Sequence, residues 1–263
     1  MPNISISNIA WDSVNDVEVF NLLHKYGITG IEIAPTKIFK DLLAVTDEEV
    51  LQYKNYINSN GFSIPAMQSI FFGKPEFQIF DTSTHDEMFR YIDNLGRIAK
   101  LLDCKVLVFG CPKNRSYNET SNIESAIDIF REMADILLKY NVTIGLEANP
   151  SVYNCNYATS INDVIDIVDK VNKPNFKVHF DTGASDINKE DILNQILQNW
   201  DKFCHLHISA PFLENIKTLS ISPTSVLSTI SSTNYNNWIS IEMKAQPEQV
   251  YNILSSLESL LHG

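Results

Sequence analysis

The chain has 263 residues, of which 44% are hydrophobic and 20% charged, and this composition excludes a disordered or low-complexity protein. Its formal net charge of -12 repels a phosphate backbone, so we expect a small-molecule substrate and no nucleic-acid partner. No apolar run suits a transmembrane helix, and the first residues do not resemble a secretory signal, so we expect no membrane partner and a cytoplasmic protein. The length suits a single barrel domain over residues 1–263.

Strand-like apolar segments recur along the chain, and an amphipathic helical pattern lies between each pair. That alternation is typical of βαβ units and therefore of a parallel sheet. Eight such segments predict an α/β protein with one (β/α)8 barrel, the TIM barrel fold. The predicted strands centre on residues 4–7, 30–33, 64–68, 105–109, 143–147, 177–181, 203–208 and 238–242.

Local signals mark the ends of several predicted helices. Thr46 and Glu49 have the spacing of a capping box, which predicts the start of the second helix. Pro223 suits the first turn of the seventh helix, because a first-turn residue has no helical partner for its N–H. Gly27 and Gly61 are placed to end the first two helices, since glycine accepts the left-handed conformation found there.

The segment 69–83 after the third predicted strand is rich in phenylalanine. Strand-to-helix loops build the active-site face of such barrels, so this segment is a candidate for a partly apolar lid. A surface loop with its own small apolar cluster is the alternative interpretation. The residues in question are Phe71, Phe72, Phe77 and Phe80.

Side-chain alternation in four consecutive strands turns ionisable residues toward the barrel interior. In the fifth strand Ile144 and Leu146 face the helices, so Glu147 faces inward. The next three strands repeat the pattern. One such residue alone is usually a capping, ion-pairing or core group, but agreement across four strands favours a shared site. The four residues are Glu147, Asp181, His207 and Glu242.

A divalent cation would resolve the repulsion between three buried carboxylates. Oxygen ligands with one imidazole suit Mn2+, Mg2+ or Co2+, and Zn2+ is also compatible. We therefore expect one divalent metal ion as cofactor, with Mn2+ the first choice. His205 shares the inward direction of His207 but lies one layer deeper, so it is interpreted as a supporting group beside the substrate site.

Six short segments, in this order, resemble the xylose-isomerase-like barrel superfamily and, more narrowly, its sugar phosphate isomerase/epimerase group. The resemblance covers essentially the whole chain. It implies that the four inward residues bind one metal, and that Glu147 and Glu242 are the acid/base pair of a mechanism through an enediolate. The segments are GIEIAP (30–35), FGCPKNR (109–115), GLEANP (145–150), HFDTG (179–183), HLHISAP (205–211) and SIEM (240–243).

Some positions depart from known members of that superfamily. Ketose 3-epimerases carry a glutamate, a histidine and an arginine where this chain has Tyr153, Ala184 and Leu213, which argues against a free-ketose 3-epimerase of the familiar kind. Endonuclease IV has further metal-binding histidines where this chain has Gln68 and Gly110. A three-metal phosphodiesterase is therefore not expected.

Residues near other strand ends are candidate substrate contacts. Lys113 and Arg115 follow the fourth strand and can hold a phosphate or carboxylate, Arg115 through its planar fork. Solvated loop charges are the open alternative for both. Candidates for hydroxyl contacts and stacking are Gln68, Asn149 and Trp11.

These observations favour a metal-dependent isomerase or epimerase of a small sugar, sugar phosphate or related polyhydroxy carbonyl compound. A metal-dependent lyase that dehydrates a keto-polyol is the second hypothesis, and a non-catalytic carbohydrate-binding barrel is the third. The substrate and its stereochemistry stay open, and so does assembly into a homo-oligomer.

Overall fold

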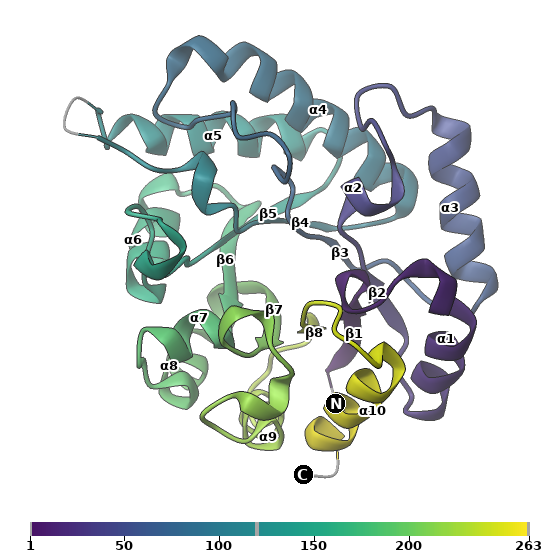
Figure 1. Cartoon of the computed structure of the whole chain (residues 1–263). Helices are drawn as coiled ribbons and strands as arrows, with labels where there is room; N and C mark the ends of the chain where they lie inside the picture. The colour runs from purple at the N-terminus through teal and green to yellow at the C-terminus, as the bar shows by residue number, and fades with distance from the viewer. Residues whose placement is uncertain (1, 119–120, 262–263) are drawn as a thin grey trace.

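The computed structural model describes residues 2–118 and 121–261 and contains one eight-stranded parallel sheet. Its strands run in the order β2-β1-β8-β7-β6-β5-β4-β3 and form the centre of the molecule (Figure 1). All eight coincide with the predicted segments to within a few residues. They are β1 (Asn3–Ser7), β2 (Gly30–Glu32), β3 (Ala66–Met67), β4 (Val106–Phe109), β5 (Thr143–Glu147), β6 (Phe176–Asp181), β7 (Phe203–Ser209) and β8 (Trp238–Glu242).

Isolated bridges join the two end strands of the sheet and nearly close the barrel. Gly30 pairs with Ser63, and Ile33 pairs with Met67, both in the parallel sense. The ladder is otherwise regular, apart from a register shift between β6 and β7 at Val178/His179. The predicted (β/α)8 barrel is therefore confirmed.

Helices surround the strands on the outside of the barrel (Figure 1). None of them, over the residues described, is long and apolar enough to cross a membrane. They are α1 (Asp16–Lys25), α2 (Pro35–Ile38), α3 (Asp47–Ser59), α4 (His85–Leu102), α5 (Ser125–Leu138), α6 (Ile161–Val171), α7 (Thr182–Ile187), α8 (Ile192–Asn199), α9 (Pro223–Ser231) and α10 (Gln249–Leu261).

The predicted helix signals are present in the structure. Thr46 Oγ1 accepts from the Glu49 N–H at 3.2 Å, and Glu49 Oε2 accepts from the Thr46 N–H at 2.8 Å, which confirms the capping box of α3. Pro223 opens α9. Gly27 and Gly61 follow α1 and α3 with φ of 69° and 81°, the left-handed conformation that glycine adopts without strain.

The barrel interior is apolar at one end and polar at the other. Ile144 and Leu146 are fully buried on the outer face of β5, under the helices. Inside the barrel, a small apolar cluster of Ala66, Val106 and Val108 packs with Cys204 near the amino ends of the strands. Ionisable side chains occupy the interior toward the carboxyl ends, so the fold itself gathers them at the active-site face.

The phenylalanine-rich segment 69–83 is anchored in the core. Phe71 and Phe77 are 1% and 3% exposed, and Phe71 packs edge-to-face on Phe109 with ring centroids 5.0 Å apart. Phe72 is 67% exposed. The two buried rings belong to the main hydrophobic core, so the aromatic residues fix the base of this loop instead of forming a separate surface cluster.

Candidate active site

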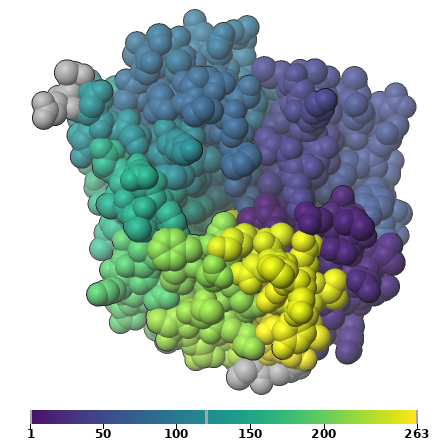
Figure 2. Space-filling view, in the orientation of Figure 1, coloured from purple at the N-terminus to yellow at the C-terminus, as the bar shows by residue number. Residues whose placement is uncertain are grey.

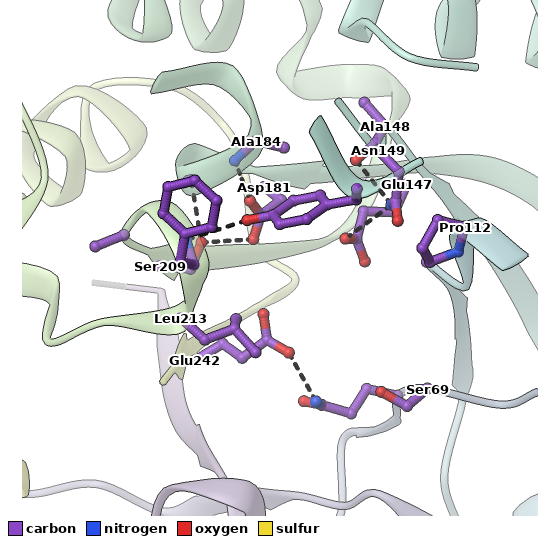
Figure 3. Close-up of a pocket in the computed structure, with 16 residues that line it drawn as sticks. Ser69, Pro112, Glu147, Ala148, Asn149, Asp181, Ala184, Ser209, Leu213 and Glu242 are labelled. Atoms are coloured by element: carbon purple, nitrogen blue, oxygen red, sulfur yellow. Dashed lines mark hydrogen bonds between the residues drawn. The ribbon is translucent and has the colours of Figure 1, made fainter. Parts of the chain in front are cut away.

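A cavity of about 400 Å³ lies at the carboxyl ends of the strands. The face seen in Figure 2 is hollowed there, and Figure 3 shows the side chains that line the hollow. Its wall includes three carboxylates, from the ends of β5, β6 and β8. The lining residues that matter below are Gln68, Gly110, Pro112, Glu147, Asn149, Tyr153, Asp181, Ala184, Ser209, Phe212, Leu213 and Glu242.

Asp181 is held rigidly at the junction of β6 and α7. Its Oδ1 accepts from the N–H of Ala184 at 2.6 Å, which caps α7, and its Oδ2 accepts from Ser209 Oγ at 2.7 Å. Ser209 is itself fixed, because its Oγ also accepts from the N–H of Gly183 at 3.0 Å. Both contacts leave the Asp181 carboxylate at the cavity wall (Figure 3).

His207 and Glu242 approach Asp181 from the neighbouring strands. His207 Nδ1 lies 3.1 Å from Glu242 Oε2 and 3.8 Å from Asp181 Oδ2, yet it makes no hydrogen bond in this geometry. The ligand atoms of these three residues all lie within 4.8 Å of one another. Gln68 Nε2 donates to Glu242 Oε1 at 2.7 Å, which leaves Oε2 toward the imidazole.

Glu147 stands across the cavity, at the end of β5 (Figure 3). Its Oε2 is 3.8 Å from His179 Nε2, and its ligand atom groups with His179 and His207. Asn149 Nδ2 donates weakly to Glu147 Oε1 at 3.4 Å. Three of the four sequence-predicted ligands line the cavity, and the fourth, His207, lies buried behind its wall. The ligand atoms form two overlapping sets that share His207.

Burial and mutual repulsion perturb the carboxylates. Burial, followed by the charges of Asp181 and Glu242, raises the pKa of Glu147 well above its usual value. Burial and the charge of Glu242 raise the pKa of Asp181 to about 6. Burial opposes a charge on His207, but the carboxylates of Glu32 and Glu242 outweigh it and raise the His207 pKa well above normal.

This donor set fits a divalent cation. The buried Nδ1 of His207 has two carboxylate oxygens nearby and no hydrogen-bond partner among the described residues. Oxygen and imidazole donors with raised carboxyl pKa values are what a cation of charge two would stabilise. Asp181, His207 and Glu242 would hold it, with Glu147 facing it from the opposite wall.

Two of the expected substrate contacts line the cavity, and Figure 3 places Asn149 beside Glu147. Gln68 and Asn149 are both buried, and each hydrogen-bonds one of the cavity glutamates. Their polar atoms are therefore already oriented by the carboxylates. In this structure the two amides therefore position the glutamates, and their contact with a substrate stays a prediction.

Arg115 and Lys113 lie outside the cavity lining. The 3-10 turn Pro112–Asn114 puts Pro112 in the wall and turns Arg115 into the interior, where it is 0% exposed. Its guanidinium carbon lies 5.7 Å from the centre of the Phe109 ring, and none of its side-chain nitrogens is hydrogen-bonded within the described residues. Lys113 is exposed, with its carbonyl accepting from Gln78. Neither residue lines the cavity in this structure, and the anion contact expected for them stays a prediction.

Trp11 and His205 also lie outside the cavity lining. Trp11 is 3% exposed, and its indole N–H donates to Asp16 Oδ1 at 2.7 Å, which holds the ring against the loop before α1. His205 is fully buried one layer below His207. In this structure Trp11 supports a loop, and His205 lies in the barrel interior as the supporting group that we expected. A contact of either residue with substrate stays a prediction.

Sequence reasoning missed two buried groups next to the site. Glu32, on β2, accepts from His207 Nε2 at 2.9 Å. His179, on β6, is 0% exposed, and its nitrogens are unpaired among the described residues. The alternation of Gly30 and Glu32 with two buried isoleucines is the same signal that found the other inward acids, and it would have found Glu32.

The rim of the cavity is built by Tyr153, Phe212 and Leu213. The N–H of Phe212 donates to the Tyr153 hydroxyl at 3.0 Å, and the two rings pack edge-to-face with centroids 5.8 Å apart. Phe212 and Leu213 both have positive φ, 61° and 58°, which is costly for residues with a side chain. The contact with Tyr153 and the bond from the Lys244 N–H to the Leu213 carbonyl hold this strained turn over the cavity.

Comparisons with known proteins agree with the architecture. Residues 20–260 match the family model described as xylose isomerase-like TIM barrel. The search of curated protein sequences gave no significant match.

Similar solved structures include several enzymes. A D-psicose 3-epimerase from Clostridium cellulolyticum H10, solved with D-tagatose, has a TM-score of 0.80 at 16% identity, covering 98% of both chains. A 3-keto-D-glucoside 4-epimerase from E. coli has a TM-score of 0.76 at 15% identity, covering 99% of both. A probable 3-DHS dehydratase from Bacillus anthracis has a TM-score of 0.75 at 12% identity, covering 99% of this chain and 98% of that one. At these identities the likeness is one of fold.

Proposed function

The chain belongs to the xylose isomerase-like TIM barrel family, and from that premise we propose that it is a divalent-metal-dependent isomerase or epimerase of a small polyhydroxy carbonyl compound, such as a sugar or sugar phosphate. The observation that carries the proposal is the presence of three carboxylates in the wall of a single cavity, with the imidazole of His207 directly behind two of them. Solved structures of the same fold include sugar epimerases, which supports the same reaction class.

Mn2+ is the proposed metal, with Mg2+, Co2+ and Zn2+ as alternatives. Asp181, His207 and Glu242 would bind it, and Glu147 would complete the set. When bound, such an ion polarises a carbonyl and lowers the pKa of the neighbouring C–H. The proton transfers are carried out by side chains of the protein.

Glu147 and Glu242 approach the cavity from opposite walls (Figure 3). We assign one as the base that removes a proton from carbon and the other as the acid that returns it to the enediolate. Return to the opposite face of the same carbon gives epimerisation, and return to the neighbouring carbon gives isomerisation. Burial and the nearby acids raise the pKa of Glu147, which brings its basicity closer to that required near neutral pH.

The cavity wall favours a substrate other than a free ketose bound in the familiar way. Tyr153, Ala184 and Leu213 line the cavity at the places where the family resemblance puts a glutamate, a histidine and an arginine. They offer one hydroxyl, which the Phe212 N–H already contacts, and two apolar groups. The proposed substrate therefore presents to this wall a side that is apolar or has few hydrogen-bonding groups.

Solvent-deuterium exchange tests the proposal. Candidate sugars, sugar phosphates and hydroxy-carbonyl compounds are incubated with the protein and Mn2+ in deuterated water, and incorporation at carbon is followed by mass spectrometry. Glu147→Gln and Glu242→Gln should each slow exchange by at least about 100-fold, the usual contribution of a general acid or base. Glu18→Gln, an exposed site on α1, is the matched control. Turnover of an identified substrate at the wild-type rate by both cavity variants would refute the two-glutamate mechanism.

A dehydratase is the second candidate, favoured by the structural likeness to a probable 3-DHS dehydratase. The same carboxylates would remove the proton, and a β-hydroxyl would leave. Dehydration produces a conjugated carbonyl, so its product absorbs in the ultraviolet and weighs one water less. Metal-dependent sugar binding without exchange at carbon would instead support the non-catalytic barrel.

A further inference from the structure

Glu32 is a fully buried carboxylate in the middle of the barrel. It lies on β2, and its Oε2 contacts two imidazoles of β7 on the other side of the interior. His207 Nε2 lies 2.9 Å from this oxygen and His205 Nε2 lies 3.2 Å from it. No other described side chain hydrogen-bonds this carboxylate, and its Oε1 is unpaired. One acid thus joins two histidines, one of which lies beside two carboxylates of the cavity wall.

These contacts fix which nitrogen of His207 carries a proton. A carboxylate only accepts hydrogen bonds, so the short contact requires a proton on His207 Nε2. The other nitrogen, Nδ1, then faces Glu242 and Asp181 at 3.1 and 3.8 Å. When a cation displaces the proton from Nδ1, an imidazole held in this way presents its Nδ1 lone pair to that cation.

Glu32 is itself anchored from below. His205 Nε2 also lies 3.1 Å from Ser240 Oγ, and Ser240 Oγ lies 2.5 Å from Ser5 Oγ. All of these side chains are 0% exposed. Burying a carboxylate without a guanidinium or ammonium partner is costly, and an apolar residue would fill the same space at lower cost. The position of Glu32 is therefore better explained by what it does to His207 than by stability.

We propose that Glu32 is the positioning residue of the metal centre, which holds His207 as the Nε2–H tautomer and aims Nδ1 at the cation. The inference rests on the proposed function, because it requires a divalent ion at Asp181, His207 and Glu242. Glu32 does not touch the cavity, since it is absent from the lining and fully buried. It acts only through the imidazole.

Metal affinity measured without substrate tests the proposal. Mn2+ binding is titrated calorimetrically for wild type, Glu32→Gln and Glu190→Gln. Glu32→Gln keeps the size of the side chain but removes the charge, and its dissociation constant should rise by about 10- to 100-fold. Glu190→Gln is the matched control, because it makes the same change at a partly buried carboxylate that accepts from the Ile161 N–H, outside the contacts of Glu32 and His207. Its affinity should stay within about threefold of wild type.

A spectroscopic measurement on the wild-type protein makes the test independent of how any variant folds. In the 15N-labelled protein loaded with Zn2+, which is diamagnetic, His207 should show a protonated Nε2 in slow exchange with solvent and no proton on Nδ1. An unprotonated Nε2, or wild-type affinity in a folded Glu32→Gln variant, overturns this inference and leaves the proposed function standing. Failure of wild type to bind any divalent ion overturns both.

Discussion

Gln68 and Glu242 are joined across the barrel mouth by a hydrogen bond of 2.7 Å, from Nε2 of the amide to Oε1 of the carboxylate. Gln68 follows β3 and Glu242 ends β8, so the contact joins two strands that are not neighbours in the sheet. Both side chains are buried, and Gln68 Oε1 is unpaired among the described residues. One oxygen of Glu242 is therefore occupied by the amide, and the other is left for His207 and a cation.

Removal of this amide should weaken metal binding. Hydrogen bonds to charged groups contribute about 1.5–3 kcal/mol, so Gln68→Ala should raise the Mn2+ dissociation constant by roughly 10- to 100-fold. Titration calorimetry measures the change. Gln52→Ala, an exposed glutamine on α3, is the control and should bind as wild type does. An unchanged constant for Gln68→Ala would mean that the amide does not orient Glu242.

Metal binding should strengthen as pH rises through about 6. Asp181 has its pKa raised to about 6, mainly by burial and by Glu242. In the metal-free fold this proton is retained between the unfolded value near about 4 and the folded value, so this group favours unfolding as pH rises over that window. A cation binds only the deprotonated carboxylate, so its affinity is lost as pH falls below 6.

The expected consequence is a pH-dependent stabilisation by metal. One proton with this pKa weakens the apparent affinity about tenfold at about pH 5, and Glu147, whose pKa is also raised, adds to the effect. The increase in Tm caused by excess MnCl2 should therefore be larger at about pH 7.5 than at about pH 5. Asp181→Asn should abolish most of the increase at both. An equal increase at both pH values in wild type would contradict the assignment.

Gly110 sets the position of the Glu147 carboxylate. A Cβ at this position would lie 2.3 Å from Glu147 Oε2 and 2.7 Å from its Cδ. The neighbour is the end of a flexible side chain, so Gly110→Ala should move the carboxylate while the barrel still folds. We expect Mn2+ affinity to fall by about tenfold or more. The strain, about 1–3 kcal/mol, should lower Tm by about 3–10 °C.

The control for Gly110→Ala is a glycine-to-alanine change whose new Cβ has no neighbouring atom within contact distance. Gly73→Ala has open space around its Cβ, although its φ of 78° adds strain. This variant should lose a comparable amount of stability and retain wild-type Mn2+ affinity. Normal affinity in Gly110→Ala would mean that Glu147 is not required at its observed position.

The strand positions and the inward residues could be predicted because each depends on alternation within a few residues. Ile144, Leu146 and Glu147 alternate along β5, and the structure buries the first two under the helices and puts the third at the cavity. The capping box of α3 is a similarly local signal. Physical rules that act over three or four residues can be read directly from the chain.

Contacts between distant segments could not be predicted in this way. Arg115 looked available for an anion because it follows a strand end, but the turn at Pro112 carries it into the interior beside Phe109. Glu32 and His207 are 175 residues apart in sequence, so their hydrogen bond depends on how the whole barrel closes. Side-chain direction in a loop and pairing across a barrel are tertiary properties, which spacing alone does not contain.

Gly30 is required where the barrel nearly closes. A Cβ there would lie 2.5 Å from Cζ3 of the Trp238 ring and 2.8 Å from Ser5 Cβ, both inside the wall formed by β1, β2 and β8. Overpacking costs about 1–3 kcal/mol, so Gly30→Ala should lower Tm by about 3–10 °C, measured by thermal unfolding. Adding Trp238→Leu makes room for the new methyl group, so the second substitution should cost less in Gly30→Ala than in wild type. Strictly additive losses would show that the ring is not the obstacle.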